Sequence, residues 1–464
     1  MAFDAELAAL RFGTGLSPDL APPASAGAML SALEGPDRMA ERFPVPGLDD
    51  ALETSREYVR LRRKMVKLRD QPGYESARKT FRSFRREQAH MRLDWHRQRL
   101  LRWSRAEEGF RERLTLFWAD HFTAQGKAGA FRHLAAPYAE SVIRPHLAAR
   151  FEDMLSAAVT SPLMLHYLDQ NRSAGPGSRR AERASSSGRT AGLNENLARE
   201  VLELHTLGVG GPYTQDDVRQ LAELFTGLTY TAKEGFTYQR GMAEPGAEII
   251  LGRSYGGGRP QLEQVLEALR DLARHPATAR HLARKLAVHF LSDQPPDALV
   301  QHLEGRYLDT GGDLPQVYAA LLEHPSAWQP ELMNVKPPFD FIASACRALG
   351  VSEAGLAALK RGQVRRLLLA PLTVMGQRWE FSSGPDGWPE ADSAWITPQA
   401  LAARLRWSMS APRRLLEPLP DPRVFAEAAL GQYAGPRVEF AARAAETESE
   451  GVGLVLASPA FQRR

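Results

Sequence analysis

Cysteine is nearly absent from this chain of 464 residues, which contains one, Cys346. A single cysteine excludes an intrachain disulfide and any zinc site built from paired thiolates. Cys346 ends an apolar stretch at residues 341–346, whereas a catalytic thiol needs an accessible, electropositive setting. We therefore interpret Cys346 as a small buried residue.

Long hydrophobic runs are also missing. The longest, around residues 367–372, falls far short of the roughly 18–20 apolar residues of a membrane-spanning helix. Acidic residues occupy positions 4 and 6 and no apolar segment follows, so the sequence predicts no signal peptide. We expect a cytoplasmic protein that enters no membrane. Export to the periplasm together with a partner is the alternative.

Several enzyme signatures are absent as well. The chain has no Gly-x-Ser-x-Gly elbow, no glycine-rich phosphate loop ending in Lys-Ser or Lys-Thr, no His-Glu-x-x-His and no dinucleotide fingerprint. These absences argue against the α/β-hydrolases, nucleotide triphosphatases, zinc peptidases and nicotinamide-dependent oxidoreductases. The enzyme class that remains possible is one in which carboxylates and imidazoles carry the chemistry.

Helical periodicity dominates what is present, and hydrophobic (43%) and charged (25%) residues are in the proportions of a globular protein. Only residues 229–231, 236–238 and 248–251 favour strands. The sequence predicts a mainly α, multi-helical protein with one small β-hairpin insertion near residues 228–255. We expect an N-terminal segment with a basic helical hairpin (1–110), a helical core (111–350) and a C-terminal helical region packed on it (351–464).

Positive charge is concentrated between Arg56 and Arg113, where 19 Lys and Arg face 8 Asp and Glu. Two interpretations stay open: a docking face for a polyanion such as an acidic polysaccharide, or ordinary solvated helix faces. Nucleic acid is disfavoured because no ribonucleoprotein motif or zinc-finger spacing occurs. A polar, basic stretch at residues 172–192 is either a lid over the site or disordered.

The segment 194–208 carries the densest set of residues capable of chemistry. On a helix its polar face consists of Asn196, Arg199, Glu200, Glu203 and Thr206. His205 lies on the opposite, apolar face. Asn194 is positioned to cap this helix and Gly208 to end it. The plain alternative is a surface helix with an Arg199–Glu203 ion pair and a core histidine.

The same wheel argument turns His121, on a helix near residues 111–124, toward the interior. We predict that His121 and His205 are both buried, each with a polar partner, and that they meet. His281, Lys285 and His289 recur at a spacing of four, which we interpret as a half-buried helix face because no acid is interleaved.

A further polar and aromatic cluster occurs late in the chain. Gln377, the triplet 387–389 with Trp388, and Trp395 are predicted to form an aromatic wall of the kind on which carbohydrates stack. Packing alone explains the tryptophans equally well.

Segment 194–208 resembles the signature of a bacterial family known as domain of unknown function 1800. Further stretches resemble that family in the same order: 116–123, 144–146, 167–169, 213–218, 275–286, 387–389 and 458–463. Two family histidines are replaced, at Ala119 before Asp120 and at Ala243 before Glu244. The resemblance implies no activity. It implies relatives that are often exported beside a sulfatase-like partner.

Three hypotheses follow. The first is a hydrolase or lyase acting on a glycan or similar polymer. Its acid–base carboxylates would be Glu200 and Glu203, which share a helix face, with His121 and His205 orienting groups or relaying protons. Its binding residues would be Asn194, Asn196, Arg199, Asp120, Asp169 and Trp388. No cofactor can be named.

The second hypothesis is a metal-dependent enzyme. Its oxygen-rich ligands would favour Mn, Mg, Ca or Fe, and they would be Asp120, His121, Glu200, Glu203 and Glu244. The third is a non-catalytic binding or assembly partner of a secreted sulfatase-like protein, with the signature acting as a buried polar network. Since two imidazoles are replaced together, we assign no residue as a metal ligand.

Overall fold

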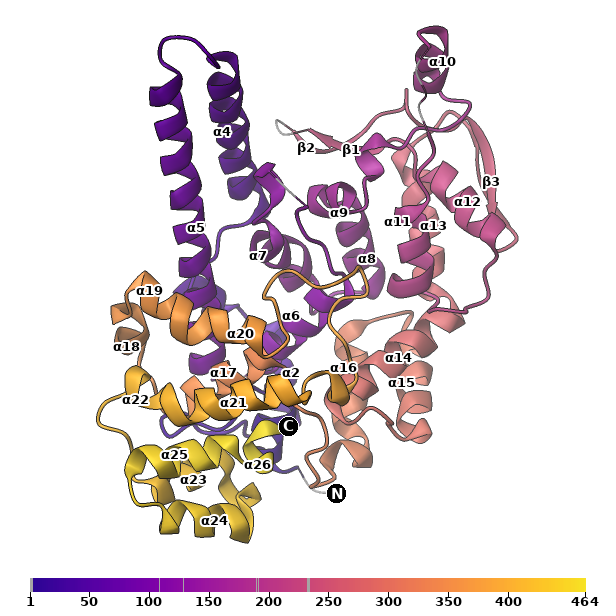
Figure 1. Ribbon diagram of the computed structural model, residues 1–464. Coiled ribbons are helices and arrows are strands. Elements are labelled where there is room, and N and C mark those ends of the chain that lie inside the picture. The colour runs from indigo at the N-terminus through magenta and orange to yellow at the C-terminus, as the bar shows by residue number, and fades with distance from the viewer. Residues whose placement is uncertain (1–2, 108, 128, 189, 191, 232–233) are drawn as a thin grey trace.

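The computed structural model describes residues 3–107, 109–127, 129–188, 190, 192–231 and 234–464. Helices make up most of these residues, as Figure 1 shows, so the predicted mainly α fold is confirmed. None of the helices in these ranges combines the length and apolarity needed to cross a bilayer.

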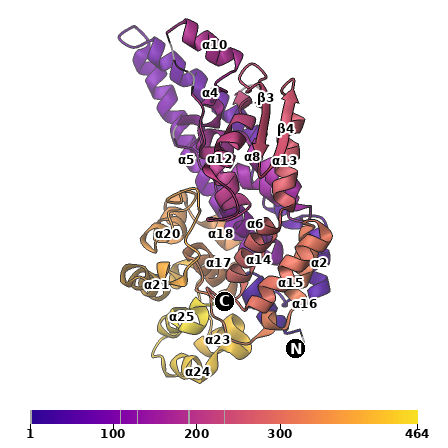
Figure 2. The ribbon, with the colours of Figure 1, turned by 90° about the vertical axis from the view of Figure 1, so that its right-hand side faces the viewer.

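The N-terminal part supplies a long helical hairpin. Its helices are α1 (Ala5–Leu7), α2 (Ala26–Glu34), α3 (Arg38–Arg42), α4 (Leu48–Lys67) and α5 (Tyr74–Arg105). The chain turns between α4 and α5 at Gly73, whose φ of 95° suits glycine. Rings of Tyr58 and Phe81 pack across the hairpin with centroids 5.2 Å apart. The hairpin projects from the body of the molecule (Figures 1 and 2).

The central part holds the largest apolar core, which runs from Leu7 to Trp328. Its helices are α6 (Phe110–His121), α7 (Ala135–Tyr138), α8 (Phe151–Thr160), α9 (Pro162–Tyr167), α10 (Arg179–Ser186), α11 (Asn196–Glu200), α12 (Gln215–Leu224), α13 (Leu262–Arg274), α14 (Pro276–Phe290), α15 (Asp297–Thr310) and α16 (Leu314–Glu323). Trp118 of α6 is fully buried, and its indole N–H donates a 2.7 Å hydrogen bond to the hydroxyl of Tyr318. Helix α6 is therefore held in the centre of this core.

The β insertion consists of two hairpins in the described residues. Strands β1 (Leu228–Thr231) and β2 (Gly235–Tyr238) pair antiparallel, and so do β3 (Gly246–Ile250) and β4 (Arg253–Gly258). The sequence predicts only one hairpin because β4 ends in three glycines and lacks an alternating pattern.

The C-terminal part forms a second apolar core around α17. Its helices are α17 (Pro338–Ala348), α18 (Glu353–Ala358), α19 (Arg361–Val364), α20 (Ala370–Val374), α21 (Pro398–Ser410), α22 (Pro412–Leu415), α23 (Pro422–Leu430), α24 (Gly435–Ala444), α25 (Glu448–Ala457) and α26 (Pro459–Gln462). Cys346 of α17 is fully buried, as expected, and burial raises the pKa of its thiol to about 12. The C-terminal end of α5 also packs in this core through Leu100 and Trp103, so α5 connects the N-terminal hairpin to the C-terminal part. The domain limits at 110 and 350 stay a prediction.

The stretch 172–192 contains helix α10, whose N-terminus is capped by Ser178. Its start is fastened by backbone hydrogen bonds from Gly175 to Met242 and from Arg180 to Gly241. In Figure 1 it stands beside the β hairpins. Helix α10 accounts for eight residues of this stretch.

Candidate functional site

Two histidines from different helices meet in the interior. His121 ends α6, and His205 ends the π-helical turn η6 (Val201–His205), which continues α11. Their ring centroids lie 6.0 Å apart, and 4% and 1% of their surfaces are exposed. The predicted inward orientation of both residues is confirmed.

The end of the signature helix explains this meeting. The last carbonyls of a helix have no donor within the helix, so other groups must satisfy them. Nε2 of His121 donates to the carbonyl of His205 at 3.2 Å, and Nε2 of His281 on α14 donates to the carbonyl of Leu204 at 3.0 Å. Two imidazoles from other helices thus cap α11–η6.

Thr206 does not lie on the polar face, so that prediction is wrong. Its side chain is fully buried, and its hydroxyl donates to the carbonyl of Val201 at 2.6 Å. The reason is the π-helical turn at 201–205, which has more residues per turn than an α-helix and rotates the residues after it.

The two histidines are neutral at physiological pH. Burial, assisted by the charge of Lys285, lowers the pKa of His205 to about 3 and that of His121 well below its usual value. The Nδ1 atom of each ring is buried without a hydrogen-bond partner among the described residues. The predicted polar partner of His121 is the carbonyl of His205, which Nε2 contacts. For Nδ1 of His205 the described residues offer no hydrogen-bond partner.

The polar face of the signature helix carries an ion-pair network. Arg199 lies 3.3 Å from Glu195 and 3.4 Å from Glu203, and it also donates to Gln215. The side chains of Arg199 and Glu203 are 37% and 26% exposed. This arrangement matches the plain alternative for Arg199 and Glu203.

Glu200 differs from Glu203. Burial, together with the charges of Glu203 and Asp386, raises the pKa of Glu200 to about 7. Asp386 belongs to a loop of the C-terminal part, so this loop lies close to the signature helix. Glu200 is thus a carboxyl group that exchanges its proton near neutral pH.

Three predicted binding residues have structural partners. Asn194 donates to the carbonyl of Leu168 at 2.9 Å, and its side-chain oxygen accepts the N–H of Asn196 at 3.0 Å. Asp169 forms an ion pair of 2.6 Å with Lys127 at the surface. None of the three lines the cavity described next.

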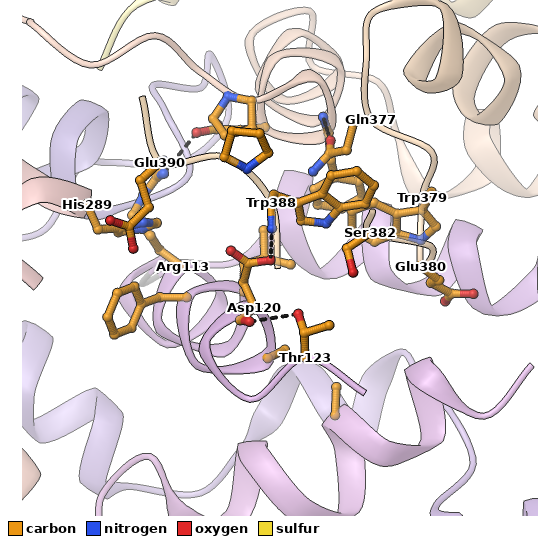
Figure 3. Close-up of a pocket in the computed structure, with 18 of the residues that line it drawn as sticks. Arg113, Asp120, Thr123, His289, Gln377, Trp379, Glu380, Ser382, Trp388 and Glu390 are labelled. Carbon is orange, nitrogen blue, oxygen red and sulfur yellow. Dashed lines mark hydrogen bonds and ion pairs between the residues drawn. The ribbon is translucent and has the colours of Figure 1, made fainter. Parts of the chain in front are cut away.

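A cavity of about 170 Å³ lies between α5, α6, the end of α14 and the segment 377–395 (Figure 3). Its aromatic lining consists of Trp103, Tyr138, Phe339, Trp379, Trp388 and Trp395. Gln377 lines it as well, so the structure places together the three parts of the predicted aromatic wall. Of the other predicted site residues, Asp120 lines this cavity, whereas Glu200, Glu203, His121 and His205 do not.

Asp120 is the carboxyl group at the centre of the cavity wall. One of its oxygens accepts the backbone N–H of Trp388 at 2.9 Å, as the dashed line in Figure 3 marks, and the residue lines the cavity. Burial raises the pKa of Asp120 to about 7, against the lowering effects of the Trp388 hydrogen bond and the charge of Lys285. Asp120 therefore holds a proton that it can give up near neutrality.

Glu390 lines this side of the cavity and forms an ion pair with Lys285, and both were missed as functional residues in the sequence. Lys285 Nζ lies 2.5 Å from Glu390, which lines the cavity and is 45% exposed at its mouth. The spacing of His281, Lys285 and His289 was the available signal, but a one-sequence pattern does not show which groups these side chains meet. His281 in fact caps the signature helix and His289 lines the cavity.

The described residues contain no group of three or more His, Cys, Asp or Glu arranged to hold a metal ion. The predicted ligands are spread over separate surroundings. Glu244 accepts the N–H of Gly177 at 2.8 Å, Glu203 pairs with Arg199, and Asp120 lies in the cavity. The five side chains of the metal hypothesis are not brought together.

Comparison with known proteins gives one match. No curated protein and no solved structure is similar to this chain. The sequence model of a family described as "Protein of unknown function (DUF1800)" matches residues 8–463, which is nearly the whole chain. The chain belongs to the DUF1800 family.

Proposed function

We propose that this protein is a hydrolase or lyase that cleaves a glycan or a similar polymer in the cavity around Asp120. The observation that carries the proposal is the position of this carboxyl group. One oxygen accepts the Trp388 amide, and the residue lines the cavity (Figure 3). A fixed, half-buried acid with a pKa of about 7 suits a general acid, because it is protonated in part at neutral pH and transfers its proton readily.

A second carboxylate with the opposite role lies nearby. Glu390 is paired with Lys285 at 2.5 Å, and its charge is one of those that raise the pKa of Asp120. In a hydrolysis step Asp120 gives its proton to the leaving oxygen, and Glu390, at the solvent-accessible mouth, takes a proton from the attacking water. In this proposal carboxylates do the proton transfer and the histidines fix the helices.

The lining favours a sugar polymer as the substrate. Trp388 and Trp395 stand with ring centroids 6.4 Å apart, and Trp379 stacks on Phe339 at 4.1 Å. Flat aromatic faces beside a few convergent polar groups are a common arrangement in small-molecule sites. Glu200, linked to this cavity through the charge of Asp386, is the next candidate carboxylate.

One observation favours the alternative of a non-catalytic assembly partner. The imidazoles of His121 and His281 cap a helix end, which is a structural task that needs no substrate. In that case the signature stabilises the fold, and the family resemblance suggests a secreted sulfatase-like protein as the partner.

The test is a screen of neutral and acidic polysaccharides for new reducing ends, which report hydrolysis, and for unsaturated products, which report a lyase. Asp120→Asn is expected to abolish turnover while the protein remains folded. Glu203→Gln, an acid-to-amide change outside the cavity, is the matched control and is expected to retain turnover. Activity lost in the Glu203 variant and kept in the Asp120 variant would overturn the proposed site. No turnover by the wild type on any polymer would leave the assembly-partner alternative.

A further inference from the structure

A second cavity of about 270 Å³ lies at the base of the α4–α5 hairpin. It is enclosed by α4, α5 and the segment 129–134, which is fastened to α4 by a 3.1 Å hydrogen bond from the hydroxyl of Ser55 to the carbonyl of Ala130. Figures 1 and 2 show this hairpin standing out from the rest of the chain. The cavity therefore lies within the basic segment of the sequence, between residues of α4 and α5.

The charge of this cavity is of one sign. Arg85, Arg132 and His133 line it, and no Asp or Glu is among the described residues around it. The first cavity differs, because Asp120, Glu380 and other acids line it. The two cavities are thus suited to different parts of a ligand.

The two arginines of the second cavity have no counter-ion among the residues that the structure describes. The side chains of Arg85 and Arg132 form no hydrogen bond or ion pair with any described residue, whereas Arg92 and Arg78, on the same helix as Arg85, are paired with Glu380 and Glu75. Exposed arginines are often unpaired, but here two of them border the same enclosed space.

The pKa of His133 reflects the positive charges around this cavity. Burial, followed by the charges of Arg92, Arg132 and Arg85, lowers its pKa to about 4, and no acid opposes them. Its Nδ1 atom is buried without a hydrogen-bond partner among the described residues. The positive charges of Arg85, Arg92 and Arg132 therefore all act on the His133 ring. Guanidinium groups bind carboxylates and sulfates through paired hydrogen bonds.

We propose that the second cavity binds the anionic group of an acidic sugar, a carboxylate or a sulfate ester, through Arg85 and Arg132. Thr54 and Gln88 offer hydrogen bonds to hydroxyl groups, and the rings of Tyr58 and Trp95 offer apolar faces.

The location of the second cavity extends the proposed function. Trp95 lines the second cavity and Arg99 lines the first, and one turn of α5, about 6 Å, separates them. Likewise His133 and Leu134 face the second cavity, and Ala135 the first. The second cavity therefore lies close to the first along α5. The choice of a sugar rests on the proposed function, whereas the anion site rests on the arginines.

The test is calorimetric titration of the full chain with four probes: a trigalacturonate, a sulfated heparin disaccharide, neutral maltotriose and oligouridylate. Arg85→Glu with Arg132→Glu is the cavity variant. Lys79→Glu with Arg86→Glu is the matched control, because it removes the same charge from exposed positions of the hairpin that do not line the cavity. Both arginines of the cavity variant are exposed, so it is expected to unfold at the wild-type temperature.

We expect one of the two acidic sugars to bind and maltotriose not to bind. The cavity variant is expected to weaken that binding by about tenfold or more, as two charge-assisted contacts are lost, and the control by less than about threefold. Binding of trigalacturonate alone identifies a carboxylate, and binding of the sulfated disaccharide alone identifies a sulfate.

No saturable binding of either acidic sugar overturns the inference, as does equal weakening in the two variants. Tighter binding of oligouridylate, with the same dependence on the cavity arginines, overturns the assignment to a sugar. The Asp120→Asn variant separates this inference from the proposed function. Turnover that requires Asp120, without acidic-sugar binding at the arginines, overturns only the inference about the second cavity. Acidic-sugar binding at the arginines without turnover overturns only the proposed enzymatic function.

Discussion

The backbone amide of Trp388 donates a 2.9 Å hydrogen bond to the carboxyl group of Asp120, across 268 positions of the sequence. This bond fastens a loop of the C-terminal part onto the end of α6 in the central core. It also closes one wall of the cavity, and it keeps the same carboxyl group away from bulk water. The position of Asp120 relative to this loop therefore depends on a contact between two parts of the chain, and burial around that contact raises the pKa of its carboxyl group.

Gly387 is expected to tolerate no side chain. Its φ is 80°, and a Cβ there would lie 2.7 Å from a carboxyl oxygen of Asp120. Gly387→Ala should lower the free energy of unfolding by about 3 kcal/mol or more, since backbone strain and a steric clash add. Gly376→Ala is the control, because its φ is 102° but open space surrounds it, and it should cost about 1 kcal/mol. Urea unfolding measures both. Equal losses would mean that the loop moves away freely.

Asp120 should make the protein less stable as pH rises. Its pKa in the folded state is about 7, above the 3.8 of a free aspartate, so the folded state holds a proton that the unfolded chain has lost. The stabilisation is complete below pH 4 and disappears as pH rises through 7. Asp120→Asn should therefore gain about 1–3 kcal/mol over wild type between pH 5 and pH 8. The exposed control Asp216→Asn should keep a constant difference, and a flat profile for Asp120→Asn would contradict the burial of this carboxyl group.

His205 should make the protein sensitive to acid. Its folded-state pKa of about 3 lies below the ordinary 6.5. Between pH 3 and pH 6.5 the unfolded chain therefore binds a proton at this residue that the folded state does not bind. Stability is full above pH 6.5 and falls by about 1.4 kcal/mol per pH unit as pH decreases toward 3. His205→Gln should flatten this slope in chemical unfolding from pH 4 to 7, and His90→Gln on the surface of α5 should not. An unchanged slope in the His205 variant would show that other groups cause the acid sensitivity.

Two ion pairs of different burial should differ in energy. Glu203→Gln breaks a partly exposed contact of 3.4 Å with Arg199 and should change stability by no more than about 0.5 kcal/mol. Asp340→Asn breaks a 2.9 Å contact with Arg113, where both side chains are at most 3% exposed, and should cost about 3–5 kcal/mol. Thermal unfolding compares the two. A loss of several kcal/mol at Glu203 would assign it to a buried network.

The periodicity of the chain determined the helices and the residues that face inward. His121 and His205 are both buried, as predicted. For His121 the helical wheel applies directly, because side-chain direction in an α-helix depends on the local backbone, whereas His205 ends a π-helical turn and still faces inward. The hairpin of α4 and α5 followed in the same way from apolar spacing and a Pro-Gly break. Thr206 shows the limit of this argument, because the π-helical turn before it has no sequence pattern that a wheel detects.

The tertiary structure alone decided which side chains share a site. Glu203 lies next to Glu200 on the helix but pairs with Arg199 in solvent, while Asp120 meets Lys285 and Glu390 from distant segments only through packing. The sequence names the carboxyl groups, but their proton affinities depend on how far water is excluded from each. That exclusion is set by apolar surfaces of α6, α14 and the 377–395 segment, whose contacts are non-local and carry no periodic signal in a single sequence.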